Sequence, residues 1–157
     1  PVMFFEHKAL YRSIDEDILD GYYTIPFGKA RLVKEGADVT IVTYGLGVHW
    51  ALELLNAHPE ISADLIDLRT LAPLDTQSIY DSVKKTGKAF VLHEDTLTGG
   101  IGGELSALIT EHCFEYLDAP VMREGSLDTP VPMNADLEIN FLPKDRFKEK
   151  LMKLLAY

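Results

Sequence analysis

The sequence has few of the features that mark secreted, membrane-spanning or nucleic-acid-binding proteins. Its 157 residues include one cysteine, Cys113, which excludes an internal disulfide and suits a reducing compartment such as the cytoplasm or a mitochondrial matrix. No apolar run approaches the roughly 18 residues of a membrane span, and the first residues lack the basic start of a signal peptide. Basic side chains are scarce, with 15 lysines and arginines against 25 acidic residues. The formal charge of −10 disfavours nucleic acid and anionic membranes as partners and favours a basic protein.

The sequence does have the apolar content of one ordinary folded domain. Hydrophobic residues make up 46% of the chain and charged residues 25%. The charges are unevenly placed, and we interpret both charged groups as solvated faces. The acidic group near the start contains Asp15, Glu16, Asp17 and Asp20, and the basic group near the end contains Lys144, Arg146, Lys148, Lys150 and Lys153.

The first 28 residues do not have the pattern of a domain core. Residues 2–5 are apolar and predict a strand with no neighbouring element before it, which indicates a chain cut from something longer. Residues 13–28 predict a connector, because they are acidic and contain Gly21, Pro26 and Gly28. Apolar side chains in this connector are expected to be covered by other residues. They are Ile18, Leu19, Tyr22, Tyr23 and Phe27.

From residue 38 onward, predicted strands and helices alternate. Apolar, β-branched runs predict strands over residues 38–44, 63–68, 89–93 and 120–123. Helices are predicted over residues 48–57 and 103–116, between a cap at Asp75 and a stop at Gly87, and after Pro143. Strands joined by helices predict an α/β fold: a three-layer open sheet, mostly parallel, with helices on both faces. The inner faces of the helices are predicted to carry Val48, Ala51, Leu52 and Leu55; Ile79 and Val83; Leu105, Leu108, Ile109 and Cys113; and Phe147, Leu151 and Leu154.

Two glycine-rich turns each join a strand to a helix, at residues 45–47 and 99–103. Glycines at a helix start allow positive φ and can expose free N–H groups to an anion. Neither turn completes a nucleotide-binding motif, because Trp50 replaces the third glycine of the dinucleotide fingerprint and Glu104 follows Gly103. We therefore favour tight turns and close helix packing over an anion site.

Polar residues follow the third predicted strand at His93, Glu94 and Asp95. A histidine beside a carboxylate can act as an acid or base, but adjacent residues on an extended chain point to opposite sides. We therefore favour a structural or interface hydrogen bond over catalysis. Cys113 is expected to be a packed thiol. The other histidines show no metal-ligand spacing, and no catalytic, cofactor-binding or metal-binding residue is assigned. These histidines are His7, His49, His58 and His112.

Several short strings, taken together and in order, resemble those of one enzyme family. PVMFFE and KALYR near the start are similar to the end of the pyrimidine-binding domain in branched-chain 2-oxo acid dehydrogenase beta subunits. IDLRTLAPLD at residues 66–75 resembles that family's carboxy-terminal domain, as do KTG, HE, LTGG and DTP further along. Pyruvate dehydrogenase beta subunits share IDLR but differ at Phe5-Glu6 and His93-Glu94, which favours the branched-chain type.

The resemblance implies three parts and a reaction. Residues 1–12 would be the tail of the pyrimidine-binding domain, 13–28 a connector, and 29–157 a transketolase carboxy-terminal-like domain. The family oxidatively decarboxylates a 2-oxo acid, here 3-methyl-2-oxobutanoate, with thiamine diphosphate and magnesium, and transfers the acyl group to a lipoyl arm. The family's cofactor and catalytic residues lie outside this segment, so the isolated chain is expected to be inactive and to bind no cofactor.

The resemblance also implies the partners. They are an alpha subunit or fused alpha part, a second beta chain, and an acyltransferase core that docks through its subunit-binding domain, with the carboxylate of Tyr157 as a candidate contact. Two alternatives remain open. One is a fragment of a pyruvate dehydrogenase beta subunit or another transketolase-like thiamine enzyme. The other is a standalone α/β module that binds a small anion at the glycine turns.

Overall fold

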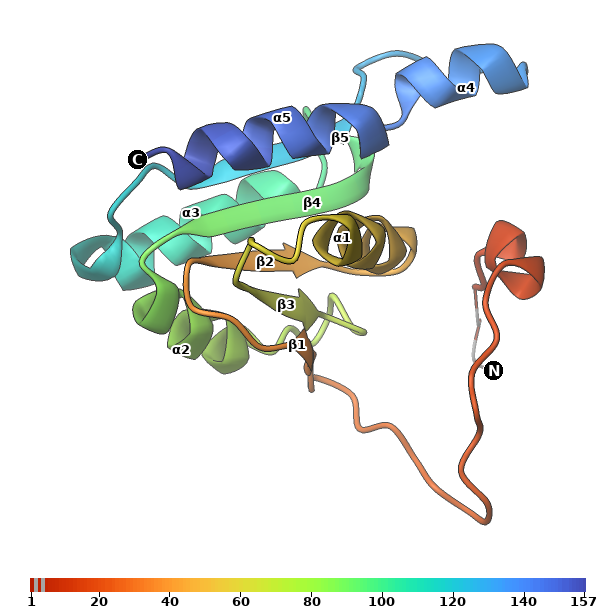
Figure 1. The fold of residues 1–157 in the computed structure, drawn as a ribbon. Helices are drawn as coiled ribbons and strands as arrows, with labels where there is room; N and C mark the ends of the chain where they lie inside the picture. Colours follow the sequence, from red (N-terminus) through yellow and green to blue (C-terminus); the bar gives the residue numbers. More distant parts are fainter. Residues whose placement is uncertain (2, 4) are drawn as a thin grey trace.

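Residues 1, 3 and 5–157 are described by the computed structural model, and from residue 31 their strands form one five-stranded sheet (Figure 1). The strands are β1 (Arg31–Lys34), β2 (Val39–Thr43), β3 (Ala63–Asp67), β4 (Ala89–Thr96) and β5 (Met122–Ser126). Their order is β1-β3-β2-β4-β5. β2 to β5 pair in parallel, and β1 is antiparallel to β3. The predicted mostly parallel, open sheet is confirmed.

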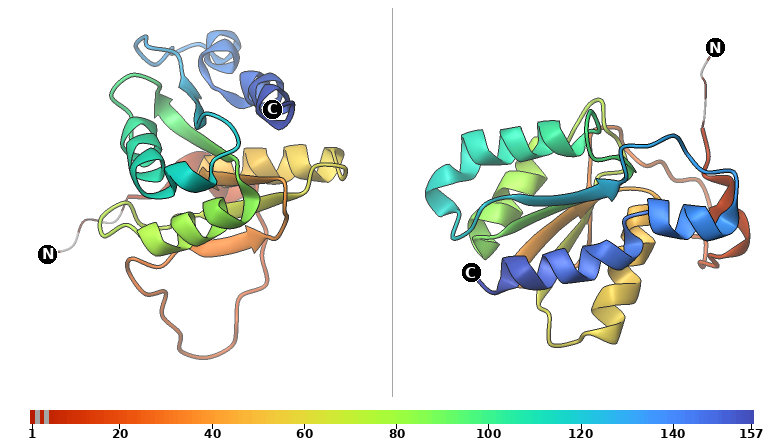
Figure 2. Two further views of the ribbon diagram at one scale, coloured as in Figure 1. Left: turned by 90° about the vertical axis from the view of Figure 1, so that its left-hand side faces the viewer. Right: turned by 90° about the horizontal axis from the view of Figure 1, so that it is seen from above.

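Helices cover both faces of the sheet and complete the three layers (Figures 1 and 2). On one face, α1 (Leu46–Ala57) and α5 (Lys144–Leu155) pack with Ile41, Phe90 and Leu92. On the other face, α2 (Thr76–Thr86) and α3 (Gly102–Cys113) pack with Val42 and Val91. Alternate residues of each central strand therefore enter different cores, as expected for strands buried on both faces.

The predicted limits of α2 are confirmed residue by residue. The Asp75 carboxylate accepts hydrogen bonds from the amide N–H of Ser78 (3.3 Å) and from its hydroxyl (2.9 Å), and it also accepts one from the N–H of Ala30 (3.0 Å). Burial alone would raise the pKa of Asp75, but these hydrogen bonds outweigh burial and lower it. Gly87 ends the helix with φ of 71°, a conformation that glycine adopts without strain.

Replacing Asp75 with alanine is expected to lower the free energy of unfolding by about 1–2 kcal/mol, because the cap of α2 and its link to Ala30 are lost together. Since the folded-state pKa of Asp75 is lowered, this contribution is present above about pH 4, the unfolded value, and is lost as the pH falls below it. Urea unfolding of Asp75→Ala beside Asp81→Ala, at an exposed position of the same helix, measures the difference. Equal stability of the two variants would contradict the capping role.

Other expected boundaries need correction. The helix predicted over residues 103–116 ends at Cys113 and continues as a 3₁₀ turn, Phe114–Tyr116, and the fourth predicted strand begins two residues later than expected, at Met122. Strand β1, the 3₁₀ helix η1 (Lys8–Arg12) and helix α4 (Ala135–Phe141) were not predicted. The strand predicted over residues 2–5 is not found: residues 3 and 5 are in no strand, and positions 2 and 4 lie outside the described residues.

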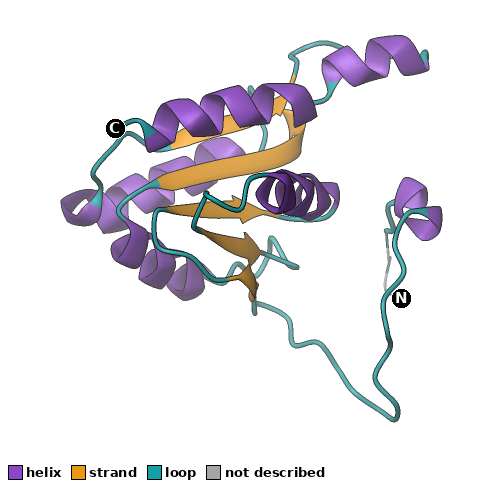
Figure 3. Ribbon diagram, viewed as in Figure 1, coloured by secondary structure: helices purple, strands orange, loops and turns teal. Residues whose placement is uncertain are grey.

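The N-terminal arm, residues 5–28, extends away from the sheet (Figures 1 and 3). Its apolar side chains were expected to be covered, but they are exposed in this chain, with 95% of Tyr22 and 83% of Phe27 accessible. The arm makes an ion pair from Glu16 to Arg31 (3.7 Å), and its beginning returns to the sheet at His7. In the part of the chain that the structure describes, no helix has the length and apolar character needed to cross a bilayer.

Candidate functional site at the carboxyl edge of the sheet

The polar residues and glycine turns singled out in the sequence meet at the carboxyl ends of β2 and β4. The chain leaves β2 through α1 to reach β3 on one side, and leaves β3 through α2 to reach β4 on the other side of β2. The carboxyl ends of β2 and β4 thus form the switch point where open α/β sheets bind ligands. Whether this edge can hold a ligand depends on the space and charge around it.

His93 fills a glycine cage, which consists of Gly100, Gly102 and Gly125. Its side chain has no exposed surface. A Cβ atom on Gly100 or on Gly125 would lie 2.7 Å from ring atom Cε1, and a Cβ on Gly102 would overlap Nε2. Real side chains do not approach so closely, so the ring occupies the space that side chains at these positions would need. The glycine turn at residues 99–103 therefore serves packing around His93.

The first glycine turn, residues 45–47, also serves close packing, on the face of the sheet that α1 covers. A Cβ on Gly47 would overlap the Oγ1 atom of Thr43, and Gly45 adopts φ of 55°. Thr43 is fully buried at the end of β2. Both turns therefore bring a helix start close to a strand end, as the sequence interpretation favoured.

His93 and Glu94 point to opposite sides of β4, as expected for adjacent residues on a strand. Neither ring nitrogen of His93 has a hydrogen-bond partner among the described residues, so the hydrogen bond expected at this position is not found. Burial lowers the pKa of His93, and the neighbouring carbonyl and charge of Asp95 oppose this only in part. The Glu94 carboxylate instead lies 3.1–3.2 Å from Nε2 of His7 in the N-terminal arm. The pair His93-Glu94 is therefore not a cooperating acid and base.

The edge of the sheet carries negative charge. Burial raises the pKa of the Tyr44 hydroxyl, and the nearby carboxylates of Asp95 and Glu94 raise it further. Glu104 adds a third carboxylate in the first turn of α3, where a bound anion would otherwise meet free N–H groups. The arrangement opposes a phosphate or diphosphate at the glycine turns.

Substituting Gly102 with alanine is expected to lower the free energy of unfolding by about 1–3 kcal/mol, because the added methyl group competes with the His93 ring in a packed core. Gly103 is a matched control in the same helical turn, since a Cβ there would meet only Nη1 of Arg123, at 3.9 Å. Gly103→Ala should be neutral or slightly stabilising, because alanine favours helix. Thermal unfolding of both variants tests the cage, and equal melting temperatures would contradict it.

Other chemistry-bearing residues are placed for structural roles. Cys113 is fully buried in the core beneath α2 and α3, as predicted, and burial raises the pKa of its thiol. His58 lies 2.8 Å from the Glu60 carboxylate, and His112 lies against the ring of Tyr80. Across residues 1, 3 and 5–157, no three His, Cys, Asp or Glu side chains are grouped to hold a metal ion.

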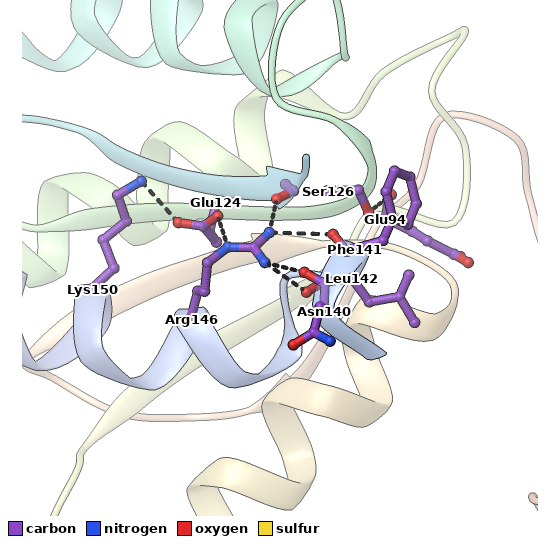
Figure 4. A network of polar contacts seen from close by, with 9 residues as sticks. Glu94, Glu124, Ser126, Asn140, Phe141, Leu142, Arg146 and Lys150 are labelled. Carbon is purple, nitrogen blue, oxygen red and sulfur yellow. Dashed lines mark hydrogen bonds and ion pairs between the residues drawn. The ribbon is translucent and has the colours of Figure 1, made fainter. Parts of the chain in front are cut away.

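A partly buried ion network lies beside this edge, on the α5 face of β5, and sequence patterns did not predict it (Figure 4). Glu124 is 6% exposed and pairs with Nε of Arg146 (3.2 Å) and Nζ of Lys150 (2.8 Å). The Arg146 guanidinium also donates to backbone carbonyl oxygens at the ends of β5 and α4. These belong to Gly125 (2.9 Å), Asn140 (2.9 Å), Leu142 (3.1 Å) and Phe141 (3.4 Å).

For Arg146 and Lys150, this network corrects the interpretation of the basic group near the chain end as a solvated face, whereas Lys144, Lys148 and Lys153 are exposed as expected. Arg146 and Lys150 lie one helical turn apart and face β5, and Lys144 pairs with Glu53 of α1 at 2.8 Å. Their acidic partners lie on other elements, more than 20 residues away in the sequence, so no local sequence pattern predicts these ion pairs. Three of the five basic residues therefore join elements together.

Comparison with known families agrees with this architecture. Residues 28–146 match the family model described as the transketolase, C-terminal domain. The chain belongs to this family. This chain is similar in structure to a solved split-gene transketolase, described as an inactive beta4 tetramer. The TM-score is 0.71 and the sequence identity 27%, over 90% of this chain and 46% of that one.

Among curated relatives of this transketolase C-terminal domain, the mitochondrial 2-oxoisovalerate dehydrogenase subunit beta of Dictyostelium discoideum is 44% identical over 100% of the chain and 43% of its own length. The pyruvate dehydrogenase E1 component subunit beta of Rickettsia bellii is 40% identical over 100% of the chain and 49% of its own length. The chain thus spans about half the length of these relatives. The resemblance to 2-oxo acid dehydrogenase beta subunits is confirmed.

Proposed function

We propose that this chain is the carboxy-terminal part of the beta subunit in the decarboxylating component of a 2-oxo acid dehydrogenase complex, where it serves subunit assembly and docking. The observation that carries the proposal is 44% identity to a 2-oxoisovalerate dehydrogenase beta subunit across the whole chain. The branched-chain substrate 3-methyl-2-oxobutanoate is the first choice, and pyruvate is the alternative that the 40% identical relative favours. The corresponding location is the cytoplasm or the mitochondrial matrix.

Thiamine diphosphate and magnesium would be held by other parts of the parent enzyme. The residues at the carboxyl edge do not fit the cofactor, because the His93 ring fills the glycine cage and Glu94, Asp95 and Glu104 oppose a diphosphate. The described residues also present no cluster of magnesium ligands. No catalytic step is therefore assigned to this chain, and the domain division at residues 12 and 28 remains a prediction.

An assembly role is supported by the apolar surface of the N-terminal arm. Ile18, Leu19 and Tyr22 are 79%, 73% and 95% exposed, which is unusual for a run of large apolar side chains. In the proposed parent, the preceding pyrimidine-binding domain, the alpha part and a second beta chain would cover this surface. Removal of this apolar surface from water would favour association of the subunits.

A docking role is supported by charge. The formal charge of −10 is complementary to a basic subunit-binding domain of an acyltransferase core, and such complementarity speeds and orients association. Two exposed acidic groups are candidates, Asp15 to Asp20 in the arm and Asp136 with Glu138 on α4. Lysine substitutions in the docking group should abolish binding of the acyltransferase in the assembled enzyme. Unchanged binding after reversal of every exposed acidic group would exclude electrostatic docking.

The experiment that tests the proposed function uses the full-length parent protein with its alpha part, thiamine diphosphate and magnesium. Decarboxylation of 3-methyl-2-oxobutanoate in preference to pyruvate supports the branched-chain assignment, and the reverse preference supports the pyruvate alternative. The isolated chain, assayed in parallel, should show neither activity. Saturable binding of phosphate or a nucleotide by the isolated chain, together with a native polypeptide mass of 17.6 kDa, would favour a standalone binding module instead.

A further inference from the structure

A histidine at position 93 is expected to destabilise the fold relative to an apolar residue, because the position is fully buried. Its ring has no exposed surface, and both of its nitrogens lack hydrogen-bond partners among the described residues. A buried polar group without a partner costs free energy that an apolar side chain of similar volume would not. The glycine cage nevertheless fits the ring closely at Gly100, Gly102 and Gly125. Such a ring is tolerated only in its neutral form.

The loop over the cage, residues 97–101, and the end of β4 before it are also held by hydrogen bonds with β5 and with Asp128. The Ser126 hydroxyl donates to the carbonyl oxygen of Glu94 (2.5 Å), and Nη1 of Arg123 donates to that of Leu97 (2.6 Å). The Asp128 carboxylate accepts hydrogen bonds from the amide N–H (2.8 Å) and hydroxyl (2.6 Å) of Thr98. On the side that faces the sheet, Gly100 of the loop packs against the His93 ring.

We propose that His93 and its glycine cage form an acid-sensitive latch, which holds the loop of residues 97–101 on the sheet when the ring is neutral and releases it when the ring is protonated. An imidazolium carries two N–H donors and a full charge. The three residues of the cage are glycines, which have no charged side chain to neutralise it. The charged ring can be solvated only by leaving the cage, and the loop must move for it to leave. The sheet itself does not depend on the ring, because its hydrophobic cores lie on either side of the strands.

The charges around His93 do not offset the effect of burial on the protonated ring inside the cage. On β4, Asp95 offers its backbone carbonyl and a carboxylate whose attraction is weaker than the effect of burial. On β5, Arg123 repels the proton, and the Glu124 carboxylate, paired with α5, attracts it less than burial opposes it. From α3, Glu104 is exposed to solvent. The loop above the ring contributes Gly100, which has no charge.

The latch also reaches the N-terminal arm. Glu94, near the end of β4 just before the loop, carries the carboxylate that contacts His7, 87 residues earlier in the sequence. Loosening the loop would therefore loosen the contact by which the arm returns to the sheet. In this way a single protonation couples the position of the arm to the pH around the protein.

Amide hydrogen exchange of the wild-type chain between pH 7.5 and 5, corrected for the intrinsic pH dependence of exchange, tests the latch. The reporters are the amides of Leu97, bonded to Ser126, and Gly103, bonded to Gly100, and the reference is Leu68, bonded to Thr43 in the sheet. A ring whose pKa is lowered by folding takes up its proton more readily when released, so opening is favoured as the pH falls below about 6.5. The opening constants of the reporters should rise about fivefold between pH 6.5 and 5.5, while that of Leu68 stays constant.

Two variants identify the group that titrates. In His93→Leu the pH dependence of the reporter amides should vanish, and in His112→Gln, which removes an exposed histidine, it should persist. Reporter opening that does not change with pH in the wild type overturns the proposal, and so does an equal rise at Leu68 or an undiminished rise in His93→Leu. If His93→Leu does not fold, the wild-type reporters and reference decide the question together with His112→Gln.

Discussion

Replacing Arg146 with methionine is expected to lower the free energy of unfolding by about 3 kcal/mol, one of the two largest single-site effects in this chain. The change removes the partly exposed side of an ion pair and leaves the buried Glu124 carboxylate, 6% exposed, with Lys150 alone. It also removes the donor shared by four backbone carbonyl oxygens at the ends of β5 and α4. Methionine retains most of the packing volume, so the loss reports on the polar contacts.

The matched control for this prediction is Lys148→Met, which removes the same charge from an exposed position of the same helix. Its unfolding free energy should stay within about 0.5 kcal/mol of the wild-type value. Urea denaturation followed by tryptophan fluorescence measures both variants, since Trp50 lies in the core that α5 covers. An Arg146→Met variant as stable as Lys148→Met would mean that the network is not needed to hold β5, α4 and α5 together.

The second large effect is expected from Phe147→Ala, with a loss of about 3–5 kcal/mol in the free energy of unfolding. Phe147 is 1% exposed, and its ring centroid lies 5.1 Å from that of Phe90 in β4. Truncation would leave a cavity between α5 and the sheet, and the two neighbouring anchors Leu151 and Leu154 prevent the helix from moving inward to fill it.

Met152→Ala is the control for the cavity, because Met152 lies in the same helix and is 44% exposed. It should cost well under 1 kcal/mol, since the removed atoms were largely in contact with water. Differential scanning calorimetry gives both values. If the two variants lose similar stability, the α5 face of the sheet contributes less to the core than its burial indicates.

Sequence patterns predicted the centre of this fold because the centre is determined by local chemistry. β2, β3 and β4 are buried on both faces and therefore appear as apolar, β-branched runs, and α2 carries its cap and its stop in its own sequence at Asp75 and Gly87. The edges were missed for the opposite reason. β1 has four residues with charges at both ends, and α4 has seven residues after a proline-containing loop, so neither forms a recognisable period.

The carboxyl edge was predicted in part. The glycine turn and His93 could be identified because they are close in the sequence. Packing was the favoured interpretation of the turn, whereas a hydrogen bond was expected at His93 and is not found. Gly125, the third member of the cage, belongs to β5 and has no sequence feature that links it to His93. The contact from Glu94 to His7 and the network around Glu124 are also set by tertiary packing, which brings together side chains that are far apart in the chain.

Helix α5 has a further consequence for how the protein is made. It follows every other helix and strand of the sheet in the sequence, yet Phe147, Leu151 and Leu154 close the core above Ile41 and Phe90. During synthesis, which proceeds from the amino terminus at roughly 5–20 residues per second, that apolar face has no cover on the α5 side until the helix leaves the ribosome. A nascent chain stalled before residue 144 would therefore be a preferred target for chaperones and prone to aggregation.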